Sequence, residues 1–283
     1  MPHAAFSPNN VAVITGGASG IGLAAAMRFA GLGMKVCIAD IGDDRLAEAA
    51  TKLAAVATGG AASVMTAAVD VSRVGAVAGL EAAVQKRFGG TDVLMNNAGI
   101  GPDSTSFGPL ENWQRILSVN LWGVIHGTQI FAPGMVKRGR PGLIINTGSK
   151  QGITTPPGNP AYNVSKAGVK ALTEALQHEL RNTDGNKVSA HLLIPGHVFT
   201  GLTSRGRPEK PAGAWTPEQT VDFMIERIDA GDFYILCPDN DVPRSLDERR
   251  MLWAIGDIVE NRPPLSRWHP DYAEAFAAFV KQK

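Results

Sequence analysis

Cysteine is scarce in this sequence. Cys37 and Cys237 are the only two among 283 residues, and neither has a second cysteine or a histidine at a metal-binding spacing. The six histidines likewise include no His-x-x-x-His pair. These absences exclude a disulfide framework and give no sign of a metal site. We therefore expect no bound metal, and we expect both cysteines to be small buried hydrophobic residues.

An excess of one charge and long apolar runs are also lacking. The 27 Lys and Arg residues nearly balance the 26 Asp and Glu residues, and no basic run occurs, which argues against nucleic acid or a membrane surface as a partner. No apolar run approaches membrane-spanning length, and residues 1–10 have neither the basic start nor the apolar core of a signal peptide. We expect a cytoplasmic protein.

Short apolar runs alternate with longer amphipathic stretches from residue 11 to about residue 237. A hydrophobic content of 44% allows one large core, so we interpret residues 1–283 as a single domain. Such alternation predicts a parallel sheet between two layers of helices, which is a doubly wound α/β fold of three layers. We expect seven strands, at 10–15, 35–39, 63–69, 92–95, 142–148, 187–194 and 233–237. We expect helices near 20–31, 43–57, 73–88, 109–138, 160–183 and 216–230.

A glycine-rich turn joins the first expected strand to the first helix, with the sequence Thr15-Gly16-Gly17-Ala18-Ser19-Gly20-Ile21-Gly22. Glycine allows backbone angles that are closed to other residues, and a helix N-terminus offers free N–H groups and a partial positive charge. An isolated turn of this kind is most often only a turn. Here it is a candidate cradle for a dinucleotide pyrophosphate, with contacts from Gly16, Ser19, Gly20, Ile21 and Gly22.

The second expected strand ends in Asp40, eighteen residues after Gly22. An acidic side chain at this position accepts hydrogen bonds from an adenosine ribose and repels a 2′-phosphate. Neither Gly17 nor Ile41 offers a positive charge, so the sequence favours NAD over NADP, with Ile41 beside the adenosine. Arg45 is close enough in sequence to reach a phosphate, although a solvated position on the following helix is the more ordinary interpretation.

Polar residues also follow the third and fourth expected strands. Asp70 and Val71 follow one strand, and Asn97, Ala98 and Gly99 follow the other. Ligands of open parallel sheets bind outside the carboxyl ends of the strands. We therefore expect Asp70 and Val71 near the adenine and the second group on the floor of the site, although an asparagine pair is also common in ordinary turns.

Three residues form a candidate reaction centre. Tyr162 and Lys166 are four residues apart at the start of an expected helix, so their side chains lie on one face. A nearby ammonium favours the tyrosinate, and we expect Lys166 to lower the pKa of Tyr162 from its usual value of about 10. A Tyr-x-x-x-Lys match alone more often marks a solvated helix face. Ser149, at the end of an apolar strand, supports the catalytic interpretation because its hydroxyl can orient a substrate oxygen.

Taken together, these motifs resemble those of the short-chain dehydrogenase/reductase family, in the same order and spacing, over roughly residues 8–240. The resemblance implies a Rossmann-type fold, a bound NAD and hydride transfer to or from a secondary alcohol or ketone. It adds Asn120 to the catalytic set, where Asn120 would fix a water that relays protons. It also places Pro195, Gly196, Val198 and Thr200 against the nicotinamide, and Tyr162 and Lys166 beside the nicotinamide ribose.

The family also implies a homodimer or a homotetramer, in which the helices at 109–138 and 160–183 pair between subunits. Val169, Leu172, Leu176 and Leu180 are candidates for the shared apolar patch. We expect the substrate pocket to be lined by the loop after Gly99, by residues 152–160 and by residues 199–215. These segments carry few charges that could pair with an anionic substrate, so we expect a bulky, largely apolar alcohol or ketone. Two alternatives remain open: a sugar-nucleotide epimerase or dehydratase, and an NAD-sensing protein without turnover.

The family pattern fades beyond about residue 240. In the tail, residues 241–283, Leu252, Ile255 and Val259 recur at helical spacing, and Phe276 and Phe279 mark a second apolar face. We expect these faces to be buried against the same subunit or a neighbour. Lining the substrate pocket is the less favoured alternative.

Overall fold

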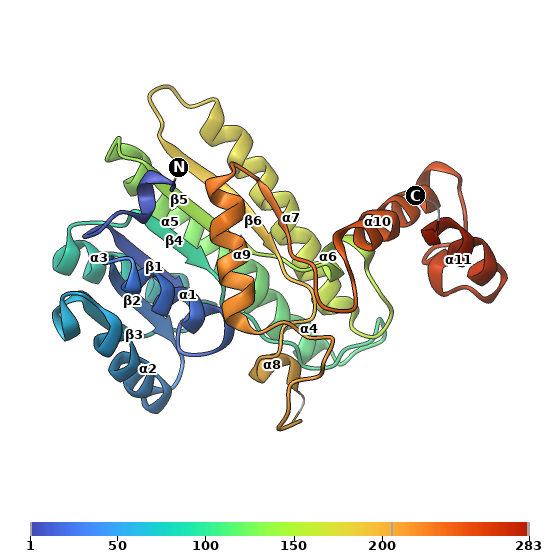
Figure 1. The fold of residues 1–283 in the computed structure, drawn as a ribbon, viewed down its shortest axis with the longest axis horizontal. Helices are drawn as coiled ribbons and strands as arrows, with labels where there is room; N and C mark the ends of the chain where they lie inside the picture. Colours follow the sequence, from blue (N-terminus) through green and yellow to red (C-terminus); the bar gives the residue numbers. More distant parts are fainter. Residues whose placement is uncertain (1, 205, 282–283) are drawn as a thin grey trace.

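Seven parallel strands form one central sheet in the order β3-β2-β1-β4-β5-β6-β7 (Figure 1). The computed structural model describes residues 2–204 and 206–281, so residues 1, 205, 282 and 283 of the predicted domain lie outside the described part. Every strand end lies within one residue of its expected position, and the seven-stranded parallel sheet is confirmed. The strands are β1 (Val11–Thr15), β2 (Lys35–Asp40), β3 (Val64–Ala68), β4 (Val93–Asn96), β5 (Gly142–Thr147), β6 (Val188–Ile194) and β7 (Tyr234–Leu236).

Alternate residues of each strand bury against opposite helix layers. Ala12 and Ile14 of β1 pack in one core with residues of α1 (Gly20–Gly31), α2 (Asp43–Val56) and α9 (Pro217–Asp229). Val11 and Val13 pack in a second core with α3 (Val74–Phe88), α5 (Gly123–Lys137) and α7 (Pro160–Arg181). The direction in which successive strands are added to the sheet reverses between β1 and β4, which are neighbours in its middle. The three-layer, doubly wound Rossmann-type fold is therefore confirmed.

The helix expected at 109–138 is divided in three. It consists of α4 (Leu110–Leu117), a π-helical turn (Ser118–Trp122) and α5 (Gly123–Lys137). A π-helical turn adds a residue to the turn of a helix and is common at functional sites. This turn carries Asn120, whose side chain is fully buried, and at Gly123 an added Cβ would lie 2.7 Å from Val71 Cγ2. The helix widens where it meets the ends of the neighbouring strands.

Short helices complete the chain. Near the carboxyl ends of the strands lie α6 (Gln151–Thr154) and α8 (Gly201–Ser204), and the tail contains α10 (Arg244–Val259) and α11 (Ala273–Lys281). The 3-10 turns are Ala4–Phe6, Gly60–Ser63, Ser266–Trp268 and Pro270–Tyr272. No helix in the described residues is both long enough and apolar enough to cross a bilayer. Within the same residues, no group of His, Cys, Asp or Glu is arranged to hold a metal ion.

The tail extends from the body of the molecule, with α10 against α6 and α11 beyond it (Figure 1). Leu252, Ile255 and Val259 are not buried against the same subunit, because these side chains are 55%, 54% and 79% exposed. Their burial against a neighbouring subunit stays a prediction. The buried side of α10 is set instead by Trp253, whose ring meets Phe276 and Phe279 edge-on and stacks under the guanidinium of Arg262. The side of α10 that carries the large indole is buried, and the side that carries the three aliphatic residues is exposed.

The apolar patch predicted on α7 for subunit pairing is also wrong. Val169, Leu176 and Leu180 are buried in the cores under the sheet, and Leu172 packs beside them. A helix that covers a sheet shows the same periodicity as a helix that pairs between subunits, and here the chain's own sheet takes the apolar face. Cys37 and Cys237 are both buried, as expected, and burial raises the pKa of each thiol to about 12.

Candidate active site

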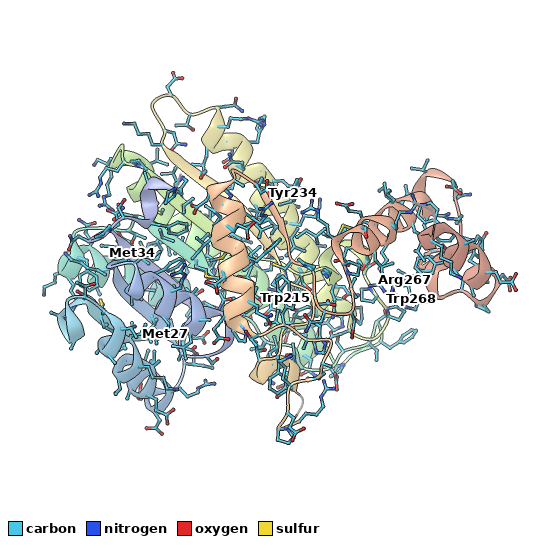
Figure 2. All side chains as sticks on the ribbon, viewed as in Figure 1. Met27, Met34, Trp215, Tyr234, Arg267 and Trp268 are labelled. Atoms are coloured by element: carbon cyan, nitrogen blue, oxygen red, sulfur yellow. The ribbon has the colours of Figure 1, made fainter. Side chains whose placement is uncertain are left out.

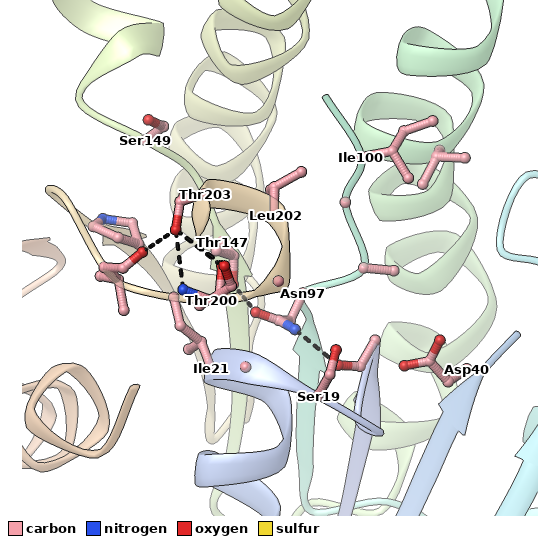
Figure 3. Close-up of a pocket in the computed structure, with 18 of the residues that line it drawn as sticks. Ser19, Ile21, Asp40, Asn97, Ile100, Thr147, Ser149, Thr200, Leu202 and Thr203 are labelled. Carbon is pink, nitrogen blue, oxygen red and sulfur yellow. Dashed lines mark hydrogen bonds between the residues drawn. The ribbon is translucent and has the colours of Figure 1, made fainter. Parts of the chain in front are cut away.

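A cavity of about 370 Å³ opens at the carboxyl ends of the strands, where the strand order reverses (Figure 3). Nearly all the predicted site residues lie in its wall, although they come from the ends of six different strands or the segments after them, and from helix α7. Gly22 and Asn120 are the exceptions and lie behind the wall. The predicted residues that line it are Gly16, Ser19, Gly20, Ile21, Asp40, Ile41, Asp70, Val71, Asn97, Ala98, Gly99, Ser149, Tyr162, Lys166, Pro195, Gly196, Val198 and Thr200.

The glycine-rich turn has the shape of a cradle, and side chains would fill it. Gly16 has a φ of 65°, and an added Cβ would lie 2.8 Å from Ala98 Cα. Gly22 was expected to contact the cofactor, but it does not line the cavity. It supports the turn from behind, where an added Cβ would lie 2.2 Å from the Gly16 carbonyl oxygen. The Ser19 side chain makes no capping hydrogen bond to α1, so the first-turn N–H groups face the cavity unblocked. The turn therefore fits a pyrophosphate.

Asp40 stands at the end of β2 with both carboxylate oxygens engaged. Oδ2 accepts from the Ala18 N–H at 3.0 Å, and Oδ1 accepts from the Ile41 N–H at 2.8 Å. Arg45 is not merely solvated, because it lines the cavity and its Nη2 lies 3.8 Å from Asp40 Oδ1. Its Nη2 also donates to the Ile41 carbonyl oxygen at 2.8 Å. The adenosine end of the cavity thus presents a carboxylate and a guanidinium side by side.

Two threonines that the sequence analysis missed hold the floor of the site. The Thr15 hydroxyl oxygen accepts from the backbone N–H groups of Asn97 and Ala98 at 3.0 and 3.2 Å. The Thr147 hydroxyl donates to Asn97 Oδ1 at 3.2 Å, which ties the floor to the end of β5 (Figure 3). Their signal was their position as the last residues of buried strands. They fix Asn97 between β1 and β5.

Tyr162 and Lys166 are placed by the start of α7. Asn159 is the N-cap, and its Oδ1 accepts from the Tyr162 N–H at 3.2 Å, while Pro160 begins the helix. Ser104 strengthens this start, since its hydroxyl donates to Asn159 Oδ1 at 2.6 Å and accepts from the Ala161 N–H at 3.1 Å. The first turn of α7 is therefore fixed before either reactive side chain contacts a ligand.

Burial governs the protonation of this pair. It raises the pKa of Tyr162, and a hydrogen bond with Ser149 opposes that rise. Burial lowers the pKa of Lys166 to about 8. The expectation that Lys166 lowers the Tyr162 pKa is wrong for this structure, because desolvation dominates and the Lys166 Nζ lies 5.7 Å from the Tyr162 ring centre and donates to the Thr147 carbonyl oxygen at 2.7 Å. The phenol is the resting form of Tyr162.

Asn120 lies in the helical segment where it was expected, and both of its polar atoms have protein partners. Its Oδ1 accepts from the Ile100 N–H at 2.8 Å, and its Nδ2 donates to the Ile100 carbonyl oxygen at 2.9 Å. Nδ2 also donates to the Ser165 hydroxyl at 3.4 Å. The side chain therefore joins the loop after β4 to α7. A proton relay through a water at Asn120 stays a prediction, and this side chain has protein partners for both of its polar atoms.

Several residues of the cavity wall were not singled out from the sequence, although the loop after Gly99 and residues 199–215 were expected to line the substrate pocket. Leu202 and Thr203 come from α8, and the Thr203 hydroxyl oxygen accepts from the Thr200 N–H at 3.0 Å. An added Cβ at Gly101 would lie 3.4 Å from Leu202 and 3.8 Å from the Tyr162 ring, so apolar atoms surround the phenol on that side. Besides Arg45, which the sequence had raised as a phosphate ligand, the further lining residues are Val69, Ile100, Val119, Thr147, Gly148, Gly201, Leu202 and Thr203.

Comparison with known proteins identifies the family. The family model for the short chain dehydrogenases matches residues 10–211. The chain is 31% identical over 263 residues to a 1-deoxy-11-beta-hydroxypentalenate dehydrogenase of Streptomyces exfoliatus, covering 91% of this chain and 93% of that protein. The protein belongs to the short-chain dehydrogenase/reductase family and is an oxidoreductase that uses a nicotinamide cofactor.

Two solved structures carry different cofactors. A short chain dehydrogenase/reductase of Burkholderia phymatum in complex with NAD superposes with a TM-score of 0.81 at 33% identity, covering 92% of this chain and 97% of that one. An alcohol dehydrogenase of Thermococcus sibiricus complexed with 5-hydroxy-NADP has a TM-score of 0.68 at 28% identity, covering 77% and 90%. The choice between NAD and NADP therefore depends on the residues of this chain.

Proposed function

We propose that the protein is an NAD-dependent dehydrogenase that interconverts a secondary alcohol and a ketone. The observation that carries this proposal is the single cavity wall shared by Tyr162, Ser149 and the dinucleotide cradle. The cofactor, when bound, supplies or accepts the hydride. The carboxylate of Asp40, at the end of β2, supports NAD as the cofactor, because a 2′-phosphate there would meet a negative charge.

In this proposal Tyr162 exchanges the proton with the substrate oxygen. Its phenol is protonated at rest, which suits donation to a ketone oxygen, and the hydrogen bond with Ser149 eases proton loss in the reverse direction. Ser149 orients the substrate oxygen, and Lys166 holds the ammonium beside the phenol and the nicotinamide ribose. Asn120 positions Ile100 in the wall of the cavity.

The substrate side of the cavity supports a bulky, largely apolar alcohol or ketone. Leu202 lines it near Tyr162, and Ile100 and Val119 are apolar residues of the same cavity wall. Among the described residues of the wall, those beyond Gly148 carry one ammonium, that of Lys166, and no carboxylate. A substrate with a large apolar body can therefore bind without leaving a buried charge unpaired.

Self-association is part of the proposal. The π-helical turn carries Trp122, 53% exposed, and α7, which packs against that turn, carries Val164, 48% exposed. We propose that this surface, rather than the buried leucines of α7, joins two subunits. A large exposed indole and an exposed valine on two elements that pack together are typical of an interface core.

The test is to mix the protein with NAD and a panel of secondary alcohols and to measure the formation of NADH by its absorbance at about 340 nm. Tyr162→Phe should reduce turnover by at least about a thousandfold while leaving NAD binding within a few-fold of normal, because it removes the exchangeable proton and keeps the ring. Tyr234→Phe is the matched control, since Tyr234 lies on an exposed edge of β7 and hydrogen-bonds Glu174. NAD binding without turnover on any alcohol or ketone would instead indicate an NAD sensor.

A further inference from the structure

A buried lysine stands directly after the proposed catalytic serine. Lys150 Nζ lies 3.4 Å from Asp239 Oδ2 and 2.5 Å from Asp247 Oδ2. The three side chains are 15%, 7% and 4% exposed, so one cation is enclosed between two carboxylates. None of the three lines the cavity described above. We call this group the Lys150 cluster.

The Lys150 cluster forms the support behind the proposed nicotinamide segment. The Lys150 N–H donates to the Pro195 carbonyl oxygen at 3.4 Å, and the His197 N–H donates to Asp239 Oδ2 at 3.2 Å. Between them, an added Cβ on Gly196 would lie 2.6 Å from Asp239 Oδ2 and 2.7 Å from Lys150 Nζ. Gly196 is therefore required for the turn to lie against the ion pair. The front of the same turn lines the cavity through Pro195 and Gly196.

The cluster also reaches into the tail. Asp247 belongs to α10, which packs against α6, and α6 begins at the residue after Lys150 (Figure 1). Asp239 and Asp247 both lie beyond the residues 10–211 that the family model matches. The carboxylates that hold the lysine beside Ser149 therefore come from the part of the chain after residue 211, where the match to the family model ends.

The energetics favour a positional role for the cluster over a purely stabilising one. A buried ion pair is often no more stable than apolar residues of the same volume, but removing one partner leaves an uncompensated charge. Burial raises the pKa of Asp247, and Lys150, followed by Arg250, opposes that rise. Paired charges with hydrogen bonds accept few alternative arrangements, so the cluster sets the relative positions of the loops that it joins.

We propose that Lys150 is a positioning residue for the reaction. With Asp239 and Asp247 it holds the Ser149 turn and the segment 195–198 in register, so that the substrate oxygen and the nicotinamide meet at the right distance. The tail is then part of the catalytic unit through α10. This inference rests on the proposed function, because it concerns the same two loops.

The experiment compares three variants with the parent enzyme. Lys150→Met should lower kcat/KM at least about tenfold, because the two carboxylates then repel each other behind the 195–198 segment. Asp247→Asn, which leaves the Lys150–Asp239 pair, should have a smaller effect in the same direction. Lys150→Met/Asp247→Asn should recover part of the loss, since it removes one of the opposed charges. Arg244→Met is the matched control, because Arg244 pairs with Glu248 on the exposed side of α10.

Two readouts separate positioning from loss of fold. Turnover is measured well below the melting temperature of each variant, with the folded fraction checked by circular dichroism. The primary isotope effect on kcat with a carbon-deuterated alcohol should rise in Lys150→Met, because a misplaced donor and acceptor make hydride transfer more rate-limiting. If Lys150→Met does not fold, Asp247→Asn carries the same test.

Each outcome has one meaning. An active parent with a slowed, folded Lys150→Met and a raised isotope effect supports the positioning role. Unchanged kcat/KM and isotope effect in the folded variants, or a loss that only matches the unfolded fraction, would overturn it while leaving the proposed dehydrogenase intact. A parent enzyme without turnover overturns the proposed function itself, and the inference with it.

Discussion

Lys166 and Thr147 are joined by a buried hydrogen bond, in which the lysine Nζ donates to the threonine carbonyl oxygen at 2.7 Å. The bond ties the second turn of α7 to the end of β5. It holds an ammonium in a fully buried position whose pKa falls to about 8 because of desolvation. The site therefore carries a charge that the folded chain holds at a cost in stability, which two pH values can reveal.

The cost should appear as a pH-dependent difference between the parent and Lys166→Met. The folded lysine has a pKa of about 8 against 10.5 in the unfolded chain, so between these values the unfolded state binds more protons and stability rises with pH. The full cost is present below pH 8 and is relieved by about pH 10.5. Relative to Lys166→Met, the parent should gain on the order of 3 kcal/mol between about pH 7 and pH 10.5.

The measurement is denaturant unfolding of both proteins at the two pH values. Comparing parent and variant cancels the titration of other groups. Equal pH dependence in the two proteins would show that Lys166 is not desolvated in the free enzyme.

Cofactor choice should depend on Asp40 and on Arg45 beside it. The carboxylate should set NAD ahead of NADP by roughly a hundredfold or more in kcat/KM, because a 2′-phosphate would meet it at hydrogen-bonding distance. Asp40→Ser should narrow the ratio of kcat/KM with NAD to kcat/KM with NADP. It should weaken the binding of NAD, and it should free Arg45, which lies 3.8 Å from the carboxylate, to contact the 2′-phosphate of NADP. Asp40→Ser/Arg45→Ala should lose the NADP gain. A parent that prefers NADP contradicts the placement of Asp40 on the ribose.

Two glycines of α1 should respond oppositely to alanine. Gly22→Ala should weaken NAD binding and destabilise the fold by a few kcal/mol, because its Cβ would lie 2.2 Å from the Gly16 carbonyl oxygen. Gly31→Ala, at the end of the same helix, meets nothing within 4 Å and should gain about 0.5–1 kcal/mol. Thermal unfolding and NAD titration check both. A harmless Gly22→Ala would mean that the turn is not a tight cradle.

Self-association should depend on Trp122. Light scattering of the parent should report at least twice the chain mass of 29.8 kDa. Trp122→Arg should shift the mass toward that of one chain, because a charge replaces the exposed indole at the centre of the proposed surface. Trp268→Arg, on the tail and 40% exposed, is the control and should leave the mass unchanged. A parent that scatters as a single chain refutes the association.

The strands were predictable because both faces of a covered parallel sheet are buried, so each strand is an unbroken apolar run that ends in polar residues. The cleft residues followed from those ends. Choices between faces could not be predicted in the same way. The periodicity of α7 did not distinguish its own sheet from a neighbouring subunit, and the inward side of α10 was set by Trp253 and its contact with Arg262.

Hydrogen bonds and ion pairs between distant segments left no recognisable pattern in the sequence. Asn120 bonds to both polar groups of Ile100, and Lys150 bonds to carboxylates about ninety residues away, 89 for Asp239. The tail gives another example: Arg267 and Trp268 (Figure 2) line a second cavity together with Gly152, which lies more than a hundred residues earlier in the sequence. Such pairings join segments whose separation in sequence carries no period.

The labelling rates of the two buried thiols can report how fast each side of the sheet opens. Cys37 lies in β2 and Cys237 directly follows β7, so the two belong to opposite flanks. A maleimide can label either one only after the chain around it has opened, because burial withholds the thiolate. Equal labelling rates would mean that the sheet opens as a unit, and a faster Cys237 would mean that the flank carrying the tail detaches first.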